Sequence, residues 1–337
     1  MFSMKKPIGL LATVTPLYHF SCLTPELSLD KGVHISRYDP AERFDEVVSR
    51  HLEVYEPHFL LWFDPLIRGH ITDLPGLFER ATRGDSSVTL QFTDLVLNLL
   101  LSLRLFKPGH LRAGETFVVF RGAEDQPWRT LGSSRASLMV VDYGILGMQT
   151  ASYSLEVEEI PFFCAFTHGI FHLMDSLDQY PALSQALSLY SADNGDYLNA
   201  VGSMTALEAL LTKKDETEGL TYRLALRIAN LLGTDASSRK ATFRQVKEFY
   251  NLRSKIVHGV TLDKKLLGRL SELDALREMV RRVLLSSMAL YSEGTKPTDL
   301  PDVLDELAMD EECRKRVAAT AAKFLHLEPQ TVTPSPN

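Results

Sequence analysis

The feature that most constrains the fold is a change in the spacing of apolar residues at about residue 160. Beyond it, apolar residues recur every three or four positions, the spacing of a helix that buries one face. The pattern predicts helices over Phe162–Ser176, Ala182–Tyr190, Tyr197–Thr212, Leu220–Leu232, Arg239–His258, Lys265–Tyr291 and Val303–Leu325. Gly233 and Gly259 directly follow two of these ranges, where we expect left-handed caps.

The sequence before residue 160 is mixed. Runs rich in β-branched and aromatic residues predict strands over Ile8–Thr15, Thr116–Arg121, Ser137–Asp142 and Tyr153–Val157. Helical spacing predicts helices over Ala41–Tyr55, Leu74–Ala81 and Val88–Phe106. We therefore expect an α+β chain, with a mixed α/β domain followed by an all-helical one. The expected bounds are 1–160, 161–327 and a disordered, Pro- and Thr-rich tail over 328–337.

Cysteine use and hydropathy indicate a cytoplasmic chain with no membrane partner. Cys22, Cys164 and Cys313 lie far apart, which argues against a disulfide framework and favours a reducing compartment. The apolar run near the amino terminus is short and is broken by Pro16, so we expect no signal peptide. The most apolar stretch, Val88–Phe106, contains charged and amide side chains and is predicted to be a buried helix.

Charge is distributed unevenly along the chain. The net charge is −7, yet the segment from Arg239 to Arg282 contains twelve basic and five acidic residues and carries +7, which leaves −14 elsewhere. A basic surface on an acidic protein attracts a polyanion to one face. The alternative is a pair of solvated helix faces with no ligand.

Two charged residues fall on helix faces that are otherwise apolar. Arg253 lies in the middle of a stripe formed by Val246, Phe249, Tyr250, Ile256 and Val257. Glu208 lies within a second stripe, formed by Val201, Met204, Leu207 and Leu211. A buried guanidinium cannot lose its charge and needs an anionic partner or a wet cleft. We therefore expect Arg253 and Glu208 to pair; the alternative to a functional role is an ion pair that fixes the register of the helices.

His258 is predicted to lie in the last turn of the helix that carries Arg253. It follows Arg253 by five residues, which is about 140° around a helix, so the two side chains do not share one face. They can meet only at the helix end, where Gly259 lets the chain turn, or across a two-fold interface between protomers. The helix end favours a positive imidazole and suits proton transfer. The alternative is a solvated helix cap.

Three stretches in the last third of the chain resemble the ApeA-like branch of the HEPN superfamily. They are Ala206–Leu211 (ALEALL), Thr221–Arg227 (TYRLALR) and Tyr250–Gly259 (YNLRSKIVHG). The superfamily motif is an arginine and a histidine with four to six residues between them, and four residues separate Arg253 from His258. Ser254 departs from the Asn, Asp or His that often follows the arginine.

A second copy of the spacing exists at Arg104 and His110, but Pro108 and Gly109 interrupt it. The copy at Arg253 and His258 lies on a predicted helix downstream of ALEALL, and it is therefore the one that carries the resemblance.

The resemblance implies a metal-independent endoribonuclease without a cofactor, often a toxin or abortive-infection effector in antiviral defence. It implies a homodimer in which both copies of the motif line one cleft, and RNA as the substrate. His258 would then transfer a proton and Arg253 would hold the phosphate, with Glu208 or Ser254 fixing the guanidinium. The residues that would steer the RNA backbone are Arg244, Lys247 and Lys255. The amino-terminal domain would sense a phage or cellular trigger.

Two other interpretations use the same residues. In the first, the helices form a catalytically inactive module for protein interaction or dimerisation, and Arg253 and Glu208 are only a structural pair. In the second, the first half of the chain is the active unit and the helices are a dimerisation arm.

Three further sets of residues have ordinary explanations. His168 and His172 stand one helical turn apart, a spacing that can hold zinc, but no third ligand is evident and packing is expected. Trp62 and Trp128 are expected in a core. The long helix over Lys265–Tyr291 suits the core of a bundle, with apolar surface left over for a dimer contact.

Overall fold

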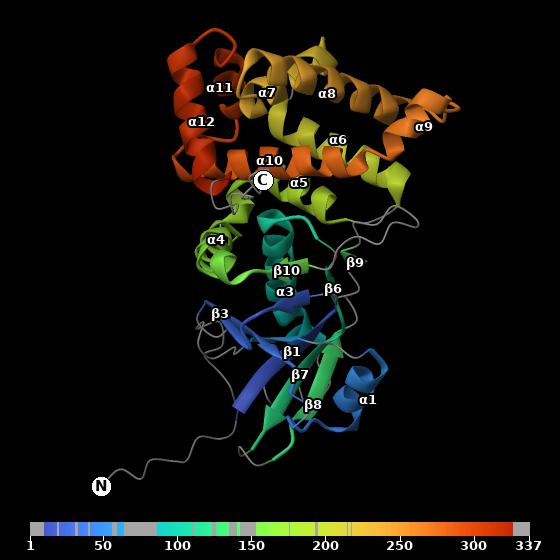
Figure 1. Cartoon of the computed structure of the whole chain (residues 1–337), viewed down its shortest axis with the longest axis vertical. Coiled ribbons are helices and arrows are strands. Elements are labelled where there is room, and N and C mark those ends of the chain that lie inside the picture. Colours follow the sequence, from blue (N-terminus) through green and yellow to red (C-terminus); the bar gives the residue numbers. More distant parts are fainter. Residues whose placement is uncertain are drawn as a thin grey trace, which may run out of the picture. The chain divides into compact units, whose positions relative to one another are not determined.

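The computed structural model describes residues 10–18, 20–30, 33–39, 41–55, 59–63, 86–109, 111–122, 126–134, 140–141, 153–174, 176–192, 195–213, 215–216 and 218–325. It confirms the α+β class, because an antiparallel sheet region is followed by a mostly helical part (Figure 1). The chain divides into two compact units, and the division falls within α4 (Ile160–Met174), between Gly169 and Ile170.

The first unit is built on an antiparallel sheet. Its described strands are β1 (Leu10–Tyr18), β3 (Glu26–Asp30), β4 (Val33–Arg37), β5 (Phe59–Phe63), β6 (Leu111–Ala113), β7 (Thr116–Arg121), β8 (Arg129–Ser134) and β9 (Val140–Val141). β1 is central: β5 pairs with one edge, while β7 and then β6 pair with the other. β4 and β3 extend the sheet beyond β5, β8 extends it beyond β7, and β9 pairs with β6. β2 (Phe20–Cys22) and β10 (Tyr153–Leu155) form a separate parallel pair.

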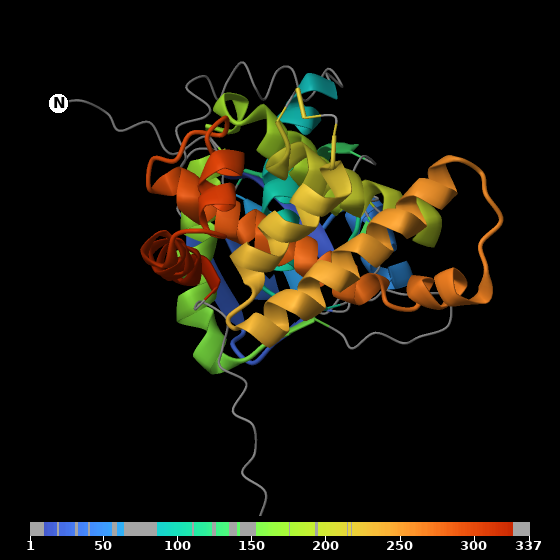
Figure 2. The same ribbon diagram turned by 90° about the horizontal axis from the view of Figure 1, so that it is seen from above.

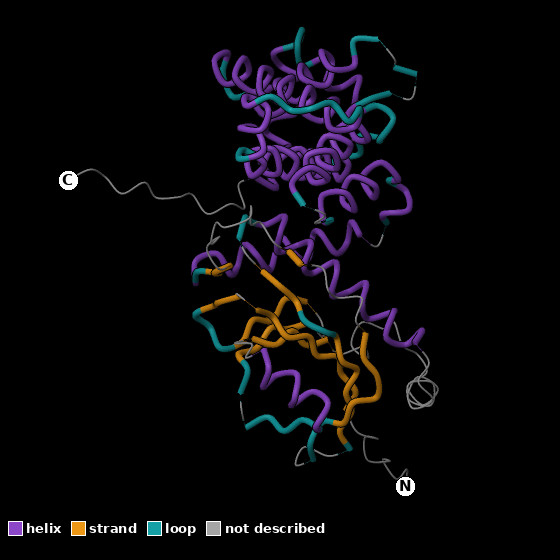
Figure 3. Tube along the Cα trace, turned by 90° about the vertical axis from the view of Figure 1, so that its right-hand side faces the viewer, coloured by secondary structure: helices purple, strands orange, loops and turns teal. Residues whose placement is uncertain are grey.

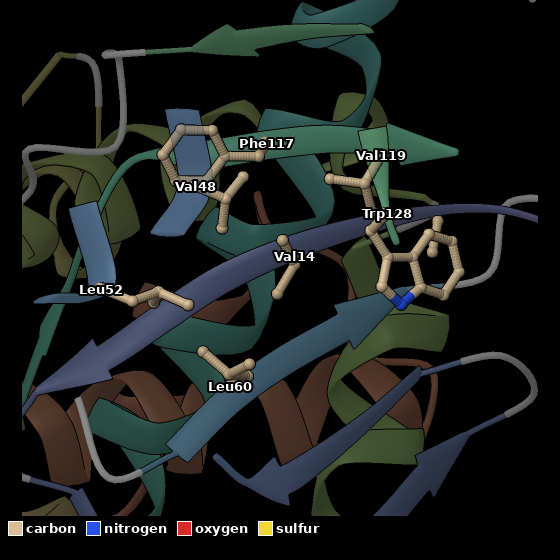
Figure 4. Close-up of a cluster of buried hydrophobic side chains, with 8 residues drawn as sticks. Val14, Val48, Leu52, Leu60, Phe117, Val119 and Trp128 are labelled. Carbon is tan, nitrogen blue, oxygen red and sulfur yellow. The ribbon is translucent and has the colours of Figure 1, made fainter. Parts of the chain in front are cut away.

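A compact apolar core lies between the sheet and α1 (Glu46–Tyr55). Val48 and Leu52 of α1 pack with side chains from β1, β5 and β7 and with Trp128, as Figure 4 shows. Trp128 is buried as expected, and its indole Nε1 donates a 2.6 Å hydrogen bond to Glu42 Oε1. α3 (Ser86–Phe106) contacts β7 and β8, and Figure 3 shows the two helices on opposite sides of the strands.

The carboxyl-terminal part of α3 is buried, as predicted for the most apolar stretch of the chain. Its side chains from Leu99 to Phe106 are all at most one-tenth exposed. Within the described residues, no helix has the length and apolar character that a membrane crossing requires.

The second unit is helical. Its elements after α4 are α5 (Pro181–Ser191), α6 (Asp196–Leu211), α7 (Leu220–Leu232), α8 (Ala236–Val257), α9 (Lys264–Leu270), α10 (Leu273–Ser292), α11 (Leu300–Glu306) and α12 (Glu311–Leu325). α10 is its centre, because it contacts α5, α6, α7 and α12 and is buried along most of its length. α7 packs along α8, the long helix that crosses Figure 2 and turns into α9.

Three predicted helices were wrong in extent. The helix predicted over Lys265–Tyr291 is two helices, because the chain turns at Ser271, whose hydroxyl donates a 2.7 Å hydrogen bond to the Gly268 carbonyl. The helix predicted over Val303–Leu325 is also two, because the Asp310 carboxylate accepts hydrogen bonds from the backbone N–H groups of Glu312 and Cys313 and so caps a new helix. The helix predicted from Ala41 begins only at Glu46, because the segment before it bridges from Phe44 to Trp128.

Most of the short strands were not predicted from the sequence. β2, β3, β4, β5, β6 and β8 were not predicted, whereas β7 and α7 have the predicted bounds. The predicted helix over Leu74–Ala81, most of the predicted strand over Ser137–Asp142, the tail over 328–337 and the side chain of Trp62 lie outside the described residues.

The two glycines that follow α7 and α8 serve different purposes. Gly259 has φ of +64°, so the left-handed cap is confirmed there. Gly233 has φ of −85° and an extended conformation, so the same prediction was wrong. A side chain at Gly233 would lie 2.9 Å from the Cα of Arg239 in α8. Glycine is needed at that position for the close approach of the two helices rather than for a left-handed turn.

Candidate active site at the end of α8

α8 is anchored at its start and along one face. The Asp235 carboxylate caps the helix by accepting hydrogen bonds of 2.7 and 2.8 Å from the backbone N–H groups of Ser237 and Ser238. Val246, Phe249 and Leu252 are fully buried, and α8 contacts α6 and α7. Arg244, Lys247 and His258 are exposed away from this face, whereas Arg253 lies beside it.

Arg253 and Glu208 pair with each other, as the sequence predicts. The Arg253 Nη2 donates a 3.2 Å hydrogen bond to Glu208 Oε2 on α6, and the Arg253 side chain is 25% exposed. The predicted apolar stripe around Arg253 is wrong in its last turn, because Val257 is exposed and Leu252 takes its place in the core. Arg253 therefore lies at the edge of the packed face rather than in its middle.

Tyr250 is a neighbour of this pair, with a part in the site that the sequence did not indicate. The guanidinium of Arg253 lies 5.9 Å from the centre of the Tyr250 ring. Burial raises the pKa of the Tyr250 hydroxyl, and the nearby Glu208 carboxylate raises that pKa further. The three side chains therefore place a guanidinium, a carboxylate and an uncharged hydroxyl close together. The only signal in the sequence was the spacing of three residues between Tyr250 and Arg253.

His258 lies at the carboxyl end of α8, in the position that ends the helix. The Gly259 N–H donates to the Ile256 carbonyl at 3.1 Å, and the Val260 N–H donates to the Lys255 carbonyl at 2.9 Å. These two bonds form a Schellman motif, which stops the helix at a fixed residue and turns the chain away. His258 is exposed to solvent, and no hydrogen bond or ion pair joins it to Arg253 within the described part of the chain.

Ser254, Arg244, Lys247 and Lys255 occupy different surroundings. Arg244 and Lys247 are exposed on α8, and neither forms an ion pair with any described residue. Lys255 is half-buried, with its Nζ 3.8 Å from Asp263 Oδ2. Ser254 is also half-buried, and within the described residues its hydroxyl makes no hydrogen bond to Arg253.

The basic surface is smaller than the sequence count predicts. Arg277 and Arg281 are buried in α10, and Arg281 pairs with Glu278 at 2.7 Å. Lys265 and Arg269 pair with Glu248. What remains exposed on α8 is Lys240, Arg244 and Lys247, which lie on the same side as Ser254 and His258 by helical spacing.

Arg253 retains unused hydrogen-bonding capacity. A guanidinium has five N–H donors, and among the described residues Arg253 donates one hydrogen bond, to Glu208. Its Nε is buried and has no described partner. The rest of the side chain is partly exposed, so its outer N–H groups can donate to an additional anionic partner from solvent.

Arg227 on α7 shows the opposite arrangement. It is fully buried, and it donates five hydrogen bonds of 2.6 to 2.9 Å: two to Glu216, two to Asp305 and one to the Leu211 carbonyl. Every donor is satisfied, so this residue is structural, and it joins α6, α7 and α11 with the loop that carries Glu216. This cluster could not be predicted from local spacing, because Asp305 lies 78 residues away from Arg227 along the chain.

Glu216 should make stability depend on pH in the acid range. Burial alone would raise the pKa of this carboxyl, but hydrogen bonds from Arg227 and Arg223 lower the pKa from 4.5 to about 2. The stabilisation is complete above pH 4.5 and is lost as the pH falls toward 2, and its full size is about 3 kcal/mol. We expect the difference in unfolding free energy between the wild type and Glu216→Gln, from urea titrations, to shrink over this interval. A difference that stays constant between pH 6 and pH 2.5 would contradict the lowered pKa.

Other candidate residues do not assemble into a site. His168 and His172 are both exposed on α4, so the packing expected for them is wrong. The described residues contain no group of three or more His, Cys, Asp or Glu side chains placed to hold a metal ion. Arg104, in the second copy of the motif, is buried in α3, and His110 lies outside the described residues.

Comparison of the chain with protein-family models, curated proteins and solved structures finds no match in any of the three.

Proposed function

We propose that the chain is a metal-independent endoribonuclease of the HEPN type, with its centre at Arg253 and His258 on α8. The observation that supports this best is the contrast between two arginines of the same helical unit. Arg227 has all five donors satisfied, whereas Arg253 is partly exposed, makes one described hydrogen bond and has a buried Nε without a described acceptor. Phosphate oxygens, like carboxylate oxygens, match the planar donors of such a guanidinium.

The chemistry follows from the substrate and these side chains. The ribose 2′-hydroxyl attacks the adjacent phosphorus, the bond from phosphorus to the 5′-oxygen breaks, and the products are a 2′,3′-cyclic phosphate and a 5′-hydroxyl. His258 takes the proton of the nucleophile or gives one to the leaving oxygen, which its exposed position permits. Arg253 holds the phosphate and stabilises the charge of the transition state, and Glu208 orients the guanidinium. In this proposal the hydroxyl of Ser254 moves to support the guanidinium when RNA binds.

A homodimer would complete the centre in this proposal. Five residues of helix place Arg253 and His258 on different sides of α8, so two copies of the chain are needed to surround one phosphate with both side chains. Val257 and Val260 flank His258 and are each 51% exposed, which is consistent with a partner surface at this end of α8. Arg244, Lys247 and Lys255 would steer the RNA backbone to the cleft. The cellular role that we propose is that of a cytoplasmic toxin in abortive infection, with the first unit binding the trigger.

The proposal is tested by incubating the purified chain with a single-stranded RNA in the presence of EDTA. We expect cleavage to fragments that carry a 2′,3′-cyclic phosphate, identified by mass spectrometry, because the 2′-hydroxyl is the nucleophile. The matched substrate has the same sequence with 2′-deoxyribose throughout, and it should remain intact. Cleavage of the deoxy substrate, or 5′-phosphate products, would rule out the proposed reaction. Sedimentation of the same sample as a monomer only would argue against a shared cleft.

The second candidate is an inactive helical module for protein interaction. The Arg253–Glu208 ion pair supports it, because an ion pair between two helices can fix their register without any ligand. The two candidates differ in what Glu208→Gln should do. An enzyme loses rate with little change in stability, whereas a purely structural pair loses stability in urea and shows no reaction to lose.

A further inference from the structure

An aromatic pair lies on the surface of the helical unit, on the open side of α7 and α8. Tyr222 of α7 is 57% exposed. Its ring meets that of Phe243 on α8 edge to face, with 5.4 Å between the centroids and 75° between the planes. A large aromatic side chain that is more than half exposed contributes little to a core and leaves a planar face for a partner.

Basic side chains accompany this pair. Lys247 Nζ lies 5.6 Å from the centre of the Phe243 ring, and Arg244 is exposed beside it on α8. Phe243, Lys247, Tyr250, Ser254 and His258 follow one another at intervals of three or four residues and therefore share one side of α8. This side, which we call the α8 stripe, extends roughly 22 Å from Phe243 to His258. It carries two aromatic side chains, Phe243 and Tyr250, with the basic Lys247 between them, and it ends at the proposed catalytic histidine.

We propose that Tyr222 and Phe243 form a stacking platform for the bases of single-stranded RNA, with the neighbouring Lys247 and Arg244 holding the phosphates. Aromatic faces and interleaved cations are how proteins bind a single strand without reading its sequence. A duplex would leave the platform empty, because its bases are already stacked on one another. The substrate class deepens the proposed function and rests on it, since the strand continues along the α8 stripe to His258.

The test measures binding apart from cleavage. The probe is a fluorescein-labelled single-stranded DNA of ten nucleotides, which offers the same bases and phosphates but has no 2′-hydroxyl and is not cut by the proposed reaction. We expect Tyr222→Leu to weaken its binding about tenfold by fluorescence anisotropy, the loss typical of one stacked base. Phe162→Leu is the matched control, because Phe162 is an exposed aromatic residue outside the α8 stripe and its loss should leave the affinity unchanged.

Two comparisons separate the platform from simple charge attraction. The wild type should bind the single strand more tightly than a duplex of the same sequence or polyglutamate. Equal affinity of Tyr222→Leu and the wild type for the single strand, or preferential binding of duplex or polyglutamate, would overturn the platform.

The outcome also distinguishes this inference from the proposed function. Cleavage of RNA by the wild type, together with unaltered binding by Tyr222→Leu, would support the proposed nuclease activity and refute the stacking platform. If Tyr222→Leu binds the single strand more weakly but the wild type does not cleave RNA, the stacking platform would be supported and the nuclease activity refuted. A strand of two nucleotides is too short to span the roughly 22 Å of the stripe. Its cleavage should therefore not respond to Tyr222→Leu.

Discussion

Replacing His258 with alanine should lower the rate of RNA cleavage by about 10²- to 10⁴-fold, the range in which a positioned acid or base contributes. His258 is exposed at the end of α8, and its side chain makes no described hydrogen bond that the fold would lose. The melting temperature should therefore stay close to that of the wild type. Single-turnover cleavage of a labelled RNA, followed beside thermal unfolding by circular dichroism, measures both quantities on one preparation.

The controls for this variant come from the same chain. His172→Ala removes an exposed histidine from α4 and should leave the cleavage rate unchanged. Arg253→Lys keeps the positive charge but loses the planar fork of donors, so it should also lose most of the rate. Both His258→Ala and Arg253→Lys cleaving at the wild-type rate, or cells still dying when they express these variants, would end the enzymatic proposal.

Replacing Arg227 with methionine should destabilise the protein by about 3 to 5 kcal/mol, the cost of removing one partner from a buried ion pair. The change deletes five hydrogen bonds and leaves the Glu216 carboxylate, whose side chain is 2% exposed, without its main counterion. Domains are stable by only about 5 to 15 kcal/mol, so a large share of the total would be lost. Urea unfolding followed by circular dichroism measures the change.

Arg223 provides the matched control for Arg227. It lies one turn earlier on α7 and donates to the same Glu216 at 2.7 Å, but its side chain is 50% exposed. Arg223→Met should cost less than about 1 kcal/mol, because exposed ion pairs contribute little. Equal losses of unfolding free energy for Arg227→Met and Arg223→Met would show that burial does not determine how much each ion pair stabilises the protein. Adding Glu216→Gln to Arg227→Met should recover part of the loss, since no buried charge is then left unpaired.

Local pattern was enough to predict the helical half. Leu224 and Ile228 lie four residues apart on one face of α7, and that helix has the predicted bounds. Apolar spacing did not predict the breaks between helices at Ser271 and Asp310, because the spacing continues across both turns. Local hydrogen bonds made by the Ser271 and Asp310 side chains end one helix and start the next. It also failed for β3 and β4, because five-residue strands paired with each other carry too few positions to show a period.

The site was predicted in part for a related reason. A charge on an apolar face indicates a partner somewhere, and this was enough to pair Arg253 with Glu208. The same reasoning applies to Arg227, but it cannot name Asp305, because tertiary contacts bring that carboxylate from a distant helix. The Tyr222–Phe243 pair was missed because an exposed aromatic residue and a buried one look alike in a sequence.

The Arg227 cluster has a consequence for how the chain acquires its structure during synthesis. A ribosome releases α7 well before α11, so Arg227 emerges with Glu216 but waits about 80 residues for Asp305, several seconds at ordinary translation rates. In that interval the Arg227 guanidinium, which is fully buried in the folded protein, has Glu216 but not Asp305 as a partner. The cluster can therefore be completed only after nearly the last helix of the unit has been made.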